Sequence, residues 1–228
     1  MPVELSRRNL EFPEPDEADE SGLLAVGGDL SIERLKQAYS KGIFPWYEDG
    51  MPILWWSPDP RMVLFPRKMI ISHSLKHSIK KQQFTVTIDT AFAQVIKHCA
   101  KTPRKGEDGT WITRDMRNAY TRLHEAGFAH SAEAWIDGEL VGGLYGVSLG
   151  KAFFGESMFH LVTNASKIAL YYLVEKLNSW NFEIIDAQVY TNHLESLGGE
   201  MIPRSQYMHI LEKALLIEDI AGNWKERI

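Results

Sequence analysis

Apolar positions recur with a regular period from about residue 63 onwards, whereas residues 1–62 show no sustained period. Apolar side chains spaced three and four residues apart indicate a helix with one buried face, and alternation indicates a strand. The predicted helices of the regular part span 90–101, 113–127, 165–180 and 205–215. The predicted strands are 84–88, three segments within 129–159, and 183–190.

Turn and cap residues indicate how these segments connect. Asp137-Gly138 is expected to form a hairpin turn, and Asn164 is expected to cap the helix that follows the third strand. Because that helix lies between the predicted strands 151–159 and 183–190, a right-handed crossover should place the two strands in parallel. The order of elements predicts an α/β (α+β) fold with a mixed, mostly antiparallel sheet and helices on its faces.

The segment 1–62 is rich in Pro, Gly and Trp and is expected to form a small N-terminal domain before a larger one over 63–228. One short helix is predicted to begin after Ser31, which suits an N-cap, and to end at Gly42. The three tryptophans between residues 46 and 56 stand among prolines. They are expected to make a stiff aromatic platform instead of a regular element.

Composition describes an ordinary globular protein of 228 residues, with 44% hydrophobic and 24% charged residues. No stretch approaches the ~20 apolar residues of a membrane span, and the first residues lack the apolar core of a signal peptide. The single cysteine, Cys99, falls on the apolar side of a predicted helix and is expected to pack there. We therefore expect a cytoplasmic protein that does not bind membranes.

Charge is unevenly distributed along the chain. The formal net charge of -5 argues against general affinity for nucleic acid, and no binding to DNA is expected. Between residues 62 and 88, however, there are five basic residues and no acid. Such a block either holds a phosphate backbone locally or forms a solvated basic face. Its members are Arg67, Lys68, Lys76, Lys80 and Lys81.

Three polar side chains stand out because they lie in apolar, strand-like segments. Glu156 lies in the run KAFFGESMF, and Asp186 and Gln188 share one face of the predicted strand 183–190. An ionised acid without partners is costly in such surroundings, and functional sites are where such groups collect. A reaction site is therefore the preferred interpretation, and buried acids satisfied by backbone donors are the alternative.

Motifs for several other chemistries are missing from the sequence. It contains no GxGxxG after a strand, no GxxxxGK[ST], no HExxH and no paired CxxC, so nucleotide and zinc sites lose their usual support. GESMF differs from the GxSxG motif, which argues against a serine nucleophile. No metal site is predicted.

Seven short motifs occur in the order found in bacterial leucyl/phenylalanyl-tRNA–protein transferases, and the chain resembles that family from about Leu5 to Tyr207. WWSPDPR, and GESMF beside NASK, are the most specific. The motifs are GLLAVGGDL (22–30), YSKGIFPWY (39–47), PILWWSPDPR (52–61), GTWIT (109–113), GESMF (155–159), NASK (164–167) and SLGGEMIPR (196–204).

The resemblance implies an aminoacyltransferase that moves Leu or Phe, and less readily Met, from aminoacyl-tRNA to the N-terminal Arg or Lys of a protein or peptide. The product carries an N-terminal residue that marks it for degradation. The resemblance also implies that 63–228 is a GNAT-like catalytic domain and that the reaction needs no metal and no other cofactor, coenzyme A included. We expect a monomer.

The resemblance further implies roles for individual residues. The residues expected around the reacting groups are Asp186, Gln188 and Glu156. The aminoacyl pocket is expected from Leu144, Met158, Leu170, Leu173 and Ile185, where Leu144 and Leu173 replace other apolar types. The residues expected near the tRNA 3′ end are Trp46, Trp111, Tyr39 and Tyr120. The basic block is expected to hold the acceptor-stem phosphates by shape, without reading sequence.

The implied reaction demands little basicity, because the donor ester is already activated and the acceptor α-amine has an unperturbed pKa near 8. Positioning can therefore supply much of the rate. Gln188 is expected to orient the amine through its carbonyl oxygen, and Asp186 to favour proton removal with partial general-base character. Glu156 is expected to pair with the cationic side chain of the acceptor.

Two other functions fit parts of the sequence. A coenzyme-A-dependent N-acyltransferase on the same fold would normally carry a Q/RxxGxG/A loop at the start of a helix, and LVGGLYG continues as a strand instead. A non-catalytic tRNA-binding module would explain the basic block and the aromatic residues. It would leave Glu156, Asp186 and Gln188 without a role.

Overall fold

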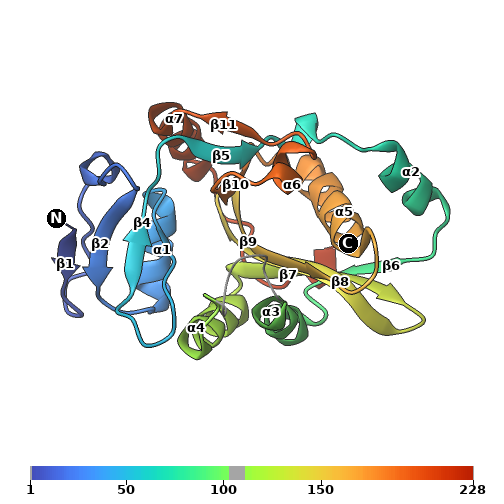
Figure 1. Cartoon of the computed structure of the whole chain (residues 1–228), viewed down its shortest axis with the longest axis horizontal. Helices are drawn as coiled ribbons and strands as arrows, with labels where there is room; N and C mark the ends of the chain where they lie inside the picture. The colour runs from blue at the N-terminus through green and yellow to red at the C-terminus, as the bar shows by residue number, and fades with distance from the viewer. Residues whose placement is uncertain (1, 103–110, 228) are drawn as a thin grey trace.

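The computed structural model describes residues 2–102 and 111–227, and Figure 1 shows their arrangement. The N-terminal strands are β1 (Val3–Leu5), β2 (Leu23–Gly27), β3 (Phe44–Pro45) and β4 (Leu54–Trp56). The later strands are β5 (Arg61–Leu64), β6 (Thr85–Ile88), β7 (Ala129–Ile136), β8 (Glu139–Leu149), β9 (Ala152–His160), β10 (Ile184–Gln188) and β11 (Glu200–Ile202). The helices are α1 (Ile32–Ser40), α2 (His73–Lys80), α3 (Phe92–Lys101), α4 (Arg114–Glu125), α5 (Ala165–Ser179), α6 (Asn192–Glu195) and α7 (Arg204–Leu215).

The strands form two sheets. The N-terminal sheet has the order β1-β2-β4-β3, and the larger sheet has the order β11-β5-β10-β9-β8-β7-β6. In the larger sheet β9 and β10 pair in parallel, and the other neighbouring strands are antiparallel. The predicted crossover through α5 and the mixed, mostly antiparallel α/β fold are therefore confirmed.

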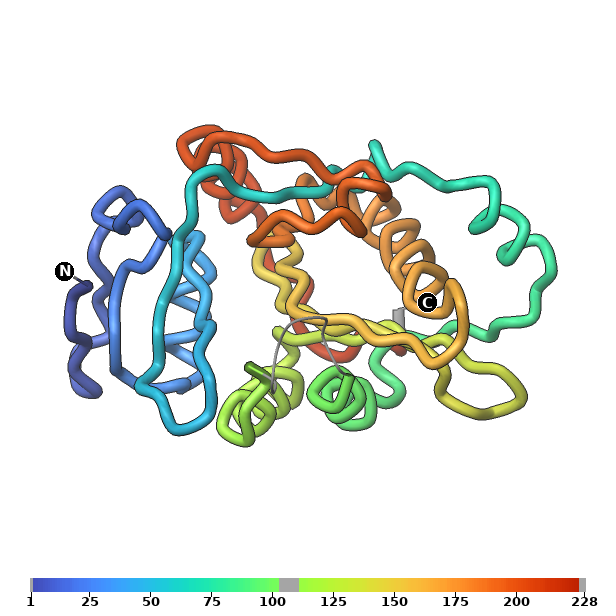
Figure 2. The backbone as a smooth tube through the Cα atoms, viewed as in Figure 1, coloured from blue at the N-terminus to red at the C-terminus, as the bar shows by residue number. Residues whose placement is uncertain are grey.

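The helices lie on both sides of the larger sheet, as the trace in Figure 2 also shows. α5 packs on one face of β7 and β8, whereas α3 and α4 lie across the other. Gly142 lets α5 approach β8 closely, because a Cβ there would lie 2.5 Å from the Cβ of Ala165. The close approach therefore holds the first turn of α5 against β8.

The helix predictions hold within a few residues. Ser31 caps α1, since its Oγ accepts a hydrogen bond from the backbone nitrogen of Arg34 at 3.3 Å. Gly42 follows the end of this helix with a φ of 68°. Asn164 occupies the N-cap position of α5 as expected, but its side chain donates to Ser78 Oγ at 3.0 Å instead of capping the helix.

The sequence pattern of the first 62 residues concealed the N-terminal sheet. The expectation of an aromatic platform without regular structure is wrong for β4, whose central residue Trp55 is fully buried. Strands of two to five residues are too short to show a sustained alternation. They become strands by pairing with segments distant in the sequence, and for the same reason β5 and β11 were not predicted.

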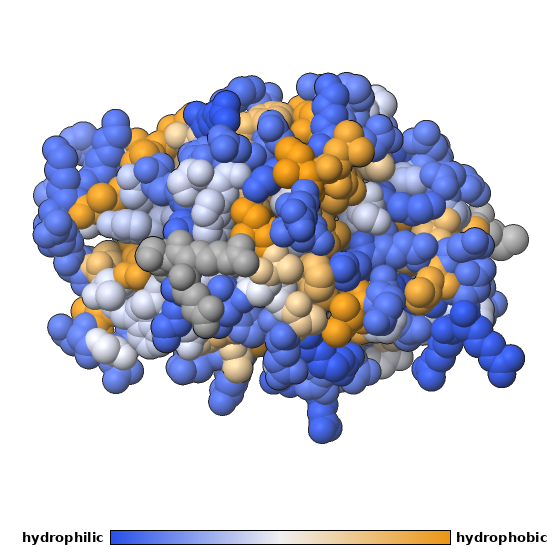
Figure 3. Space-filling model, turned by 180° about the vertical axis from the view of Figure 1, so that it is seen from behind, coloured by the Kyte–Doolittle hydropathy of each residue, from blue (hydrophilic) through white to orange (hydrophobic). Residues whose placement is uncertain are grey.

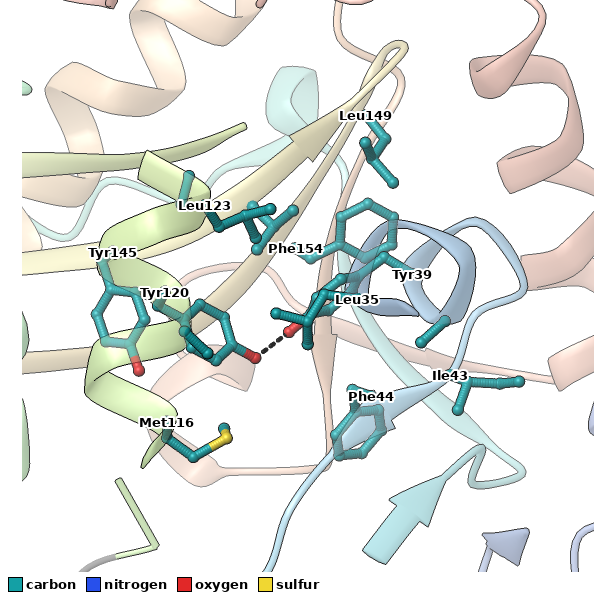
Figure 4. Close-up of a cluster of buried hydrophobic side chains, with 14 of the residues drawn as sticks. Leu35, Tyr39, Ile43, Phe44, Met116, Tyr120, Leu123, Tyr145, Leu149 and Phe154 are labelled. Carbon is teal, nitrogen blue, oxygen red and sulfur yellow. Dashed lines mark hydrogen bonds between the residues drawn. The ribbon is translucent and has the colours of Figure 1, made fainter. Parts of the chain in front are cut away.

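Two buried clusters fill the molecule. The first joins the N-terminal sheet to α1, α3, α4 and α7, and Figure 4 shows its centre around Tyr39, Tyr120 and Phe154. Cys99 is buried in this cluster, as predicted. The second cluster lies between α5 and the sheet. Because the first cluster runs from Leu5 to Ala214, the chain shares one core across residue 62, and the domain boundary there stays a prediction.

The surface is mostly polar. In the view from behind, hydrophilic residues surround smaller groups of apolar ones, as Figure 3 shows. Within residues 2–102 and 111–227, no helix has the length and apolar character needed to cross a bilayer.

Candidate active site

A pocket of about 510 Å³ opens where β9 and β10 part. The two strands pair only between Ala152–Phe154 and Ile184–Asp186. Beyond these pairs, residues 155–158 of β9 line the pocket, and so do residues 187 and 188 of β10 and residue 189 directly after it. A concave, largely apolar site with a few polar groups is the usual form of a ligand pocket.

The apolar wall contains four of the five residues predicted for an aminoacyl pocket. Leu144, Met158, Leu170 and Ile185 line it, from β8, β9, α5 and β10 respectively. Leu173 follows Leu170 on the same face of α5 but is buried in the second cluster, outside the lining. It therefore supports the wall from behind.

Two of the four aromatic residues predicted near a tRNA 3′ end lie at the pocket. Trp46 and Trp111 both line it, and Trp46 is 38% exposed. Trp56 packs against Trp46 with ring centroids 5.9 Å apart, and its Nε1 donates to the backbone oxygen of Trp46 at 2.7 Å. Trp46 thus presents a supported ring to solvent and to the pocket.

The other two, Tyr39 and Tyr120, lie beneath the pocket instead of lining it. Their rings are 1% and 0% exposed, so no ring face is open for a base to stack on. Their hydroxyl groups are hydrogen-bonded to each other, as Figure 4 shows. Tyr39 also donates to Glu156 Oε1 at 2.7 Å. The structure therefore joins these tyrosines to the polar floor of the pocket.

Glu156 is the carboxyl group that faces the pocket. Besides Tyr39, the Nε2 of Gln188 donates to its Oε1 at 3.2 Å. Burial raises the pKa of Glu156 to about 7, against the opposing effect of the hydrogen bonds from Tyr39 and Tyr120. A carboxyl group with this pKa can both release and accept a proton near neutral pH.

A β-bulge positions Gln188. The pairing of β10 with β5 shifts register between Asp186 and Gln188, and Gln188 has a φ of 59°, which non-glycine residues rarely adopt. Bulges commonly re-aim a side chain near a site. Here the carboxamide of Gln188 lines the pocket and reaches Glu156.

Asp186 lies beneath this pair and outside the pocket lining. Its side chain is fully buried and accepts four hydrogen bonds. Arg61 donates to both carboxylate oxygens at 2.8 and 2.7 Å, Tyr207 donates through its hydroxyl group at 2.8 Å, and the backbone nitrogen of Gln188 donates at 2.9 Å. Four donors occupy the carboxylate, so Asp186 is placed to hold Arg61, Tyr207 and the Gln188 backbone together.

Sequence reasoning missed Arg61 and Tyr207. Burial is the largest single influence on the pKa of Arg61 and lowers it, but the attraction of Asp186 and Tyr207 and the hydrogen bonds with them together raise that pKa above its usual range. A basic residue that ends the motif WWSPDPR directly before an apolar run was the signal that could have found it. Tyr207 gave no such signal, because a tyrosine at helical spacing is typical of a packed helix face.

A segment after Gln188 also lines the pocket and was not predicted. It contributes Val189, Tyr190, Thr191, His193 and Leu194, the last two from α6. The hydroxyl oxygen of Tyr190 lies 2.7 Å from Asn192 Oδ1 and 2.8 Å from Glu195 Oε2, within hydrogen-bond distance of both, which connects Tyr190 to α6. The predicted strand 183–190 included Val189 and Tyr190 but gave them no role, and residues 191–194 belong to none of the seven motifs, so only the fold brings this segment to the site.

The predicted basic block lies away from the pocket. All five of its residues are exposed, and none lines the pocket. Lys68 pairs with Glu200 at 2.9 Å, and Arg67 donates to Asn181 at 3.3 Å. Lys76, Lys80 and Lys81 lie on α2 or directly after it, and Figure 1 shows this helix at the end of the molecule opposite the N-terminal sheet.

In the described part of the chain, no group of three or more His, Cys, Asp or Glu residues is placed to hold a metal ion.

Fold and site together define an α/β protein with a largely apolar ligand pocket that the carboxyl group of Glu156 faces. The family model for leucyl/phenylalanyl-tRNA protein transferases matches residues 63–212, and the model for the N-terminal domain of these proteins matches residues 28–59. The chain belongs to the leucyl/phenylalanyl-tRNA–protein transferase family.

Similar proteins that carry the name of this family support the assignment. The leucyl/phenylalanyl-tRNA–protein transferase of Legionella pneumophila (strain Corby) is 55% identical over 216 residues, which cover 95% of this chain and 96% of that protein. The protein of the same name from Desulfatibacillum aliphaticivorans is 54% identical and covers 98% and 96% of the two chains. The resemblance found in the sequence motifs is thereby confirmed.

Solved structures with similar folds are more distant in sequence. L-PGS from Bacillus licheniformis is 10% identical, with a TM-score of 0.43 over 85% of this chain and 71% of that chain. A ribosomal-protein-alanine N-acetyltransferase from Brucella melitensis biovar Abortus 2308 is 17% identical, with a TM-score of 0.35 over 50% of this chain and 86% of that chain.

Proposed function

We propose that the protein transfers Leu or Phe, and less readily Met, from aminoacyl-tRNA to the N-terminal Arg or Lys of a protein, which marks that protein for degradation. Membership of the transferase family supports this activity. The observation that carries it to the site is the apolar pocket whose floor holds the hydrogen-bonded pair Glu156 and Gln188. A reaction that consumes aminoacyl-tRNA also fits a cytoplasmic protein.

The pocket holds the side chain of the transferred amino acid. Leu144, Met158, Leu170 and Ile185 offer apolar contacts that Leu, Phe and Met can all use. One methylene group contributes only ~1–3 kcal/mol of discrimination in such a pocket, so the three amino acids are not sharply separated. A charged side chain is excluded because it would lose its hydration without gaining a partner.

The terminal adenosine of the tRNA lies at the rim, where Trp46 and Trp111 line the pocket. Stacking of a base on an aromatic ring contributes ~1–3 kcal/mol. Trp56 supports this arrangement by holding the backbone of Trp46. Tyr39 and Tyr120, which the family resemblance placed at the 3′ end, act instead through Glu156.

In the transfer step, the nitrogen of the acceptor attacks the ester carbonyl carbon. The new C–N bond replaces the C–O bond to the ribose, the amine loses a proton and the ribose oxygen gains one. Gln188 uses its Nε2 to donate to Glu156, which leaves its carbonyl oxygen to orient the amine. Glu156, with a pKa of about 7, receives the proton.

This assignment moves proton acceptance from Asp186 to Glu156. Asp186 has all of its acceptor positions directed at Arg61, Tyr207 and the Gln188 backbone, and it does not line the pocket. Its contribution is to fix the bulge that aims Gln188. Replacing Asp186 with Ala is therefore expected to lower turnover far more than tRNA binding.

The exposed basic block holds the acceptor stem. Lys76, Lys80 and Lys81 are exposed and lie on α2 or directly after it, at one end of the molecule, where phosphates can be bound without any reading of sequence. The rim tryptophans thus bind the 3′ end of the tRNA at the pocket, and the basic residues on and after α2 bind its acceptor stem.

One assay tests the proposed activity against its alternatives. The protein is incubated with Leu-tRNA and a peptide with N-terminal Arg, and the peptide is examined by mass spectrometry for an added Leu; the same peptide with an acetylated N-terminus is the control. Transfer to the free peptide alone is expected. If acetyl-coenzyme A is supplied instead and an acetyl group is transferred to the peptide, the protein is a coenzyme-A-dependent N-acyltransferase. If the protein binds tRNA but transfers nothing, it is a non-catalytic tRNA-binding module.

A further inference from the structure

The C-terminal segment reaches the pocket from behind through Trp224. This residue is fully buried, and its ring stacks on His130 with centroids 3.6 Å apart. It belongs to the same buried cluster as Leu144, Leu170 and Ile185, which line the pocket. A segment that adds a large ring to this cluster contributes to the shape of the cavity beside it.

Hydrogen bonds fix Trp224 independently of packing. Its backbone nitrogen donates to Asp89 Oδ2 at 2.8 Å, and its Nε1 donates to the backbone oxygen of Ile220 at 2.8 Å. The same carboxylate lies 2.8 Å from His130 Nδ1 and accepts from the backbone nitrogen of Ser131 at 2.9 Å. Asp89 thereby clamps the C-terminal segment to β7 at the position of this one ring.

Phe153 connects the clamped ring to the pocket. It lines the pocket, is 1% exposed, and lies next to Ile185 in the β9–β10 register. The ring of Trp224 lies behind it, with centroids 6.2 Å apart. Protein interiors are close-packed, so Phe153 can retreat from the pocket only if the space behind it is vacated.

We propose that Trp224 is a positioning residue that sets the depth of the aminoacyl pocket, and with it the ratio in which Phe and Leu are transferred. This inference rests on the proposed function of the pocket. The ring of Trp224 holds Phe153 forward and keeps the cavity short. Trp224 lies in the segment after residue 212, where the match to the family model for residues 63–212 ends.

The test uses the full chain with Trp224→Phe, which keeps an apolar ring but removes volume behind Phe153. The specificity constant kcat/KM is measured for Phe-tRNA and for Leu-tRNA, and their ratio is compared with that of the starting protein. A deeper pocket favours the larger side chain, so the Phe-to-Leu ratio is expected to rise at least about threefold. Loss of stability alone lowers both constants together and leaves the ratio unchanged.

Two matched variants make the result decisive. Trp55→Phe removes the same volume from another fully buried site, packed against Phe12 in the first cluster, and should leave the ratio unchanged. Trp224→Tyr removes less volume and serves as the second variant should Trp224→Phe not fold. A ratio within about twofold of the starting protein in the folded Trp224 variant, or an equal shift in Trp55→Phe, overturns the proposal.

Met158→Ala separates this proposal from the pocket assignment on which it rests. Met158 lines the pocket directly, so its truncation should raise the Phe-to-Leu ratio whatever Trp224 does. If Met158→Ala leaves the ratio unchanged, the pocket is not the aminoacyl site and both ideas fail. If Met158→Ala changes the ratio and the Trp224 variant does not, only the role of Trp224 is lost.

Discussion

The floor of the pocket and helix α2 both gather charged side chains, but they hold them in opposite ways. Directly beneath the floor, Asp186 is fully buried and both of its oxygens are bonded to Arg61. On and after α2, Lys76, Lys80 and Lys81 are exposed to solvent. A buried charge depends on each of its partners, whereas exposed charges act together through a field that salt screens. Single changes should therefore be severe at the floor and mild on α2.

The largest effect is expected from Arg61→Met, which leaves Asp186 buried without its counter-charge. Breaking one side of a buried ion pair typically costs about 3–5 kcal/mol, so the free energy of unfolding should fall by that amount. Urea denaturation followed by tryptophan fluorescence measures the loss.

The double variant Arg61→Met/Asp186→Asn controls for lost packing around the guanidinium group. It removes both charges, so part of the stability should return, because the uncompensated carboxylate is gone. If Arg61→Met lowers the free energy of unfolding by less than about 1 kcal/mol, Asp186 does not depend on Arg61 as a buried charge depends on its partner. The contrast with α2 then fails.

Glu156→Gln tests the difference between the carboxyl group at the floor and the one beneath it. Glu156 faces the pocket with a pKa of about 7, whereas Asp186 is enclosed by donors. Turnover should fall about 10²- to 10⁴-fold, the usual contribution of general acid–base catalysis, while tRNA affinity stays nearly unchanged. Single-turnover transfer and filter binding report the two quantities.

Glu133→Gln is the matched control for this variant. Glu133 is also a buried acid whose pKa is raised by burial, but it is bonded to Thr87 and Ser131 and does not line the pocket. Its replacement should alter stability and leave turnover of the folded protein intact. Equal losses of turnover in both variants would mean that neither acid has a chemical role.

The dependence of stability on pH gives a further way to isolate Glu156. Its pKa is raised from 4.5 to about 7 in the folded protein, so the folded state binds a proton more readily than the unfolded chain. The stability that this group contributes is fully present below its unfolded pKa and is lost as pH rises through about 7. Turnover changes in the opposite direction, because the deprotonated carboxylate accepts the proton.

Comparison of the original protein with Glu156→Gln removes the contribution of all other titrating groups. Urea midpoints at pH 5 and pH 8 should fall more with rising pH in the original protein than in the variant. If the urea midpoint changes equally with pH in the two proteins, Glu156 does not titrate in this range. Another group would then have to accept the proton.

The sequence predicted those parts of the site that lie within one element or follow from one crossover. The helix between 151–159 and 183–190 correctly implied parallel strands. The crossover was also expected to let Glu156 and Asp186 face one cleft, but of these two only Glu156 lines the pocket, where it is bonded to Gln188. The family resemblance supplied most of the apolar wall. Both inferences use information that is local in the chain or stored in a motif.

Contacts between distant segments could not be predicted in this way. Arg61 and Asp186 are 125 residues apart, and the segment that contains Arg61 became a strand only by pairing with β10 and β11. Burial of Tyr39 and Tyr120 depends on α1 and α4 meeting over β9, which no pattern within either helix specifies. Trp224 lies outside every family motif, because the last of the seven motifs ends at residue 204.

The smallest effect is expected from changes to the exposed lysines on and after α2. Lys80→Glu or Lys81→Glu places an acid in a block that otherwise holds only bases, so each should weaken tRNA binding severalfold without changing the free energy of unfolding measurably. Binding of the stem depends on counterion release, and one lost phosphate contact should lower the slope of log affinity against log salt by about 1. Filter binding at several salt concentrations measures the slope.

Lys213→Glu is the matched control, because it makes the same change of charge on an exposed residue of α7, which Figure 1 shows far from α2. If the effect of Lys80→Glu comes only from total charge, both variants weaken binding equally. If α2 holds the stem, Lys80→Glu changes the slope and Lys213→Glu does not. Unchanged binding in Lys80→Glu and Lys81→Glu would move the stem contact elsewhere, and α2 would then be the solvated basic face that its charge pattern equally allowed.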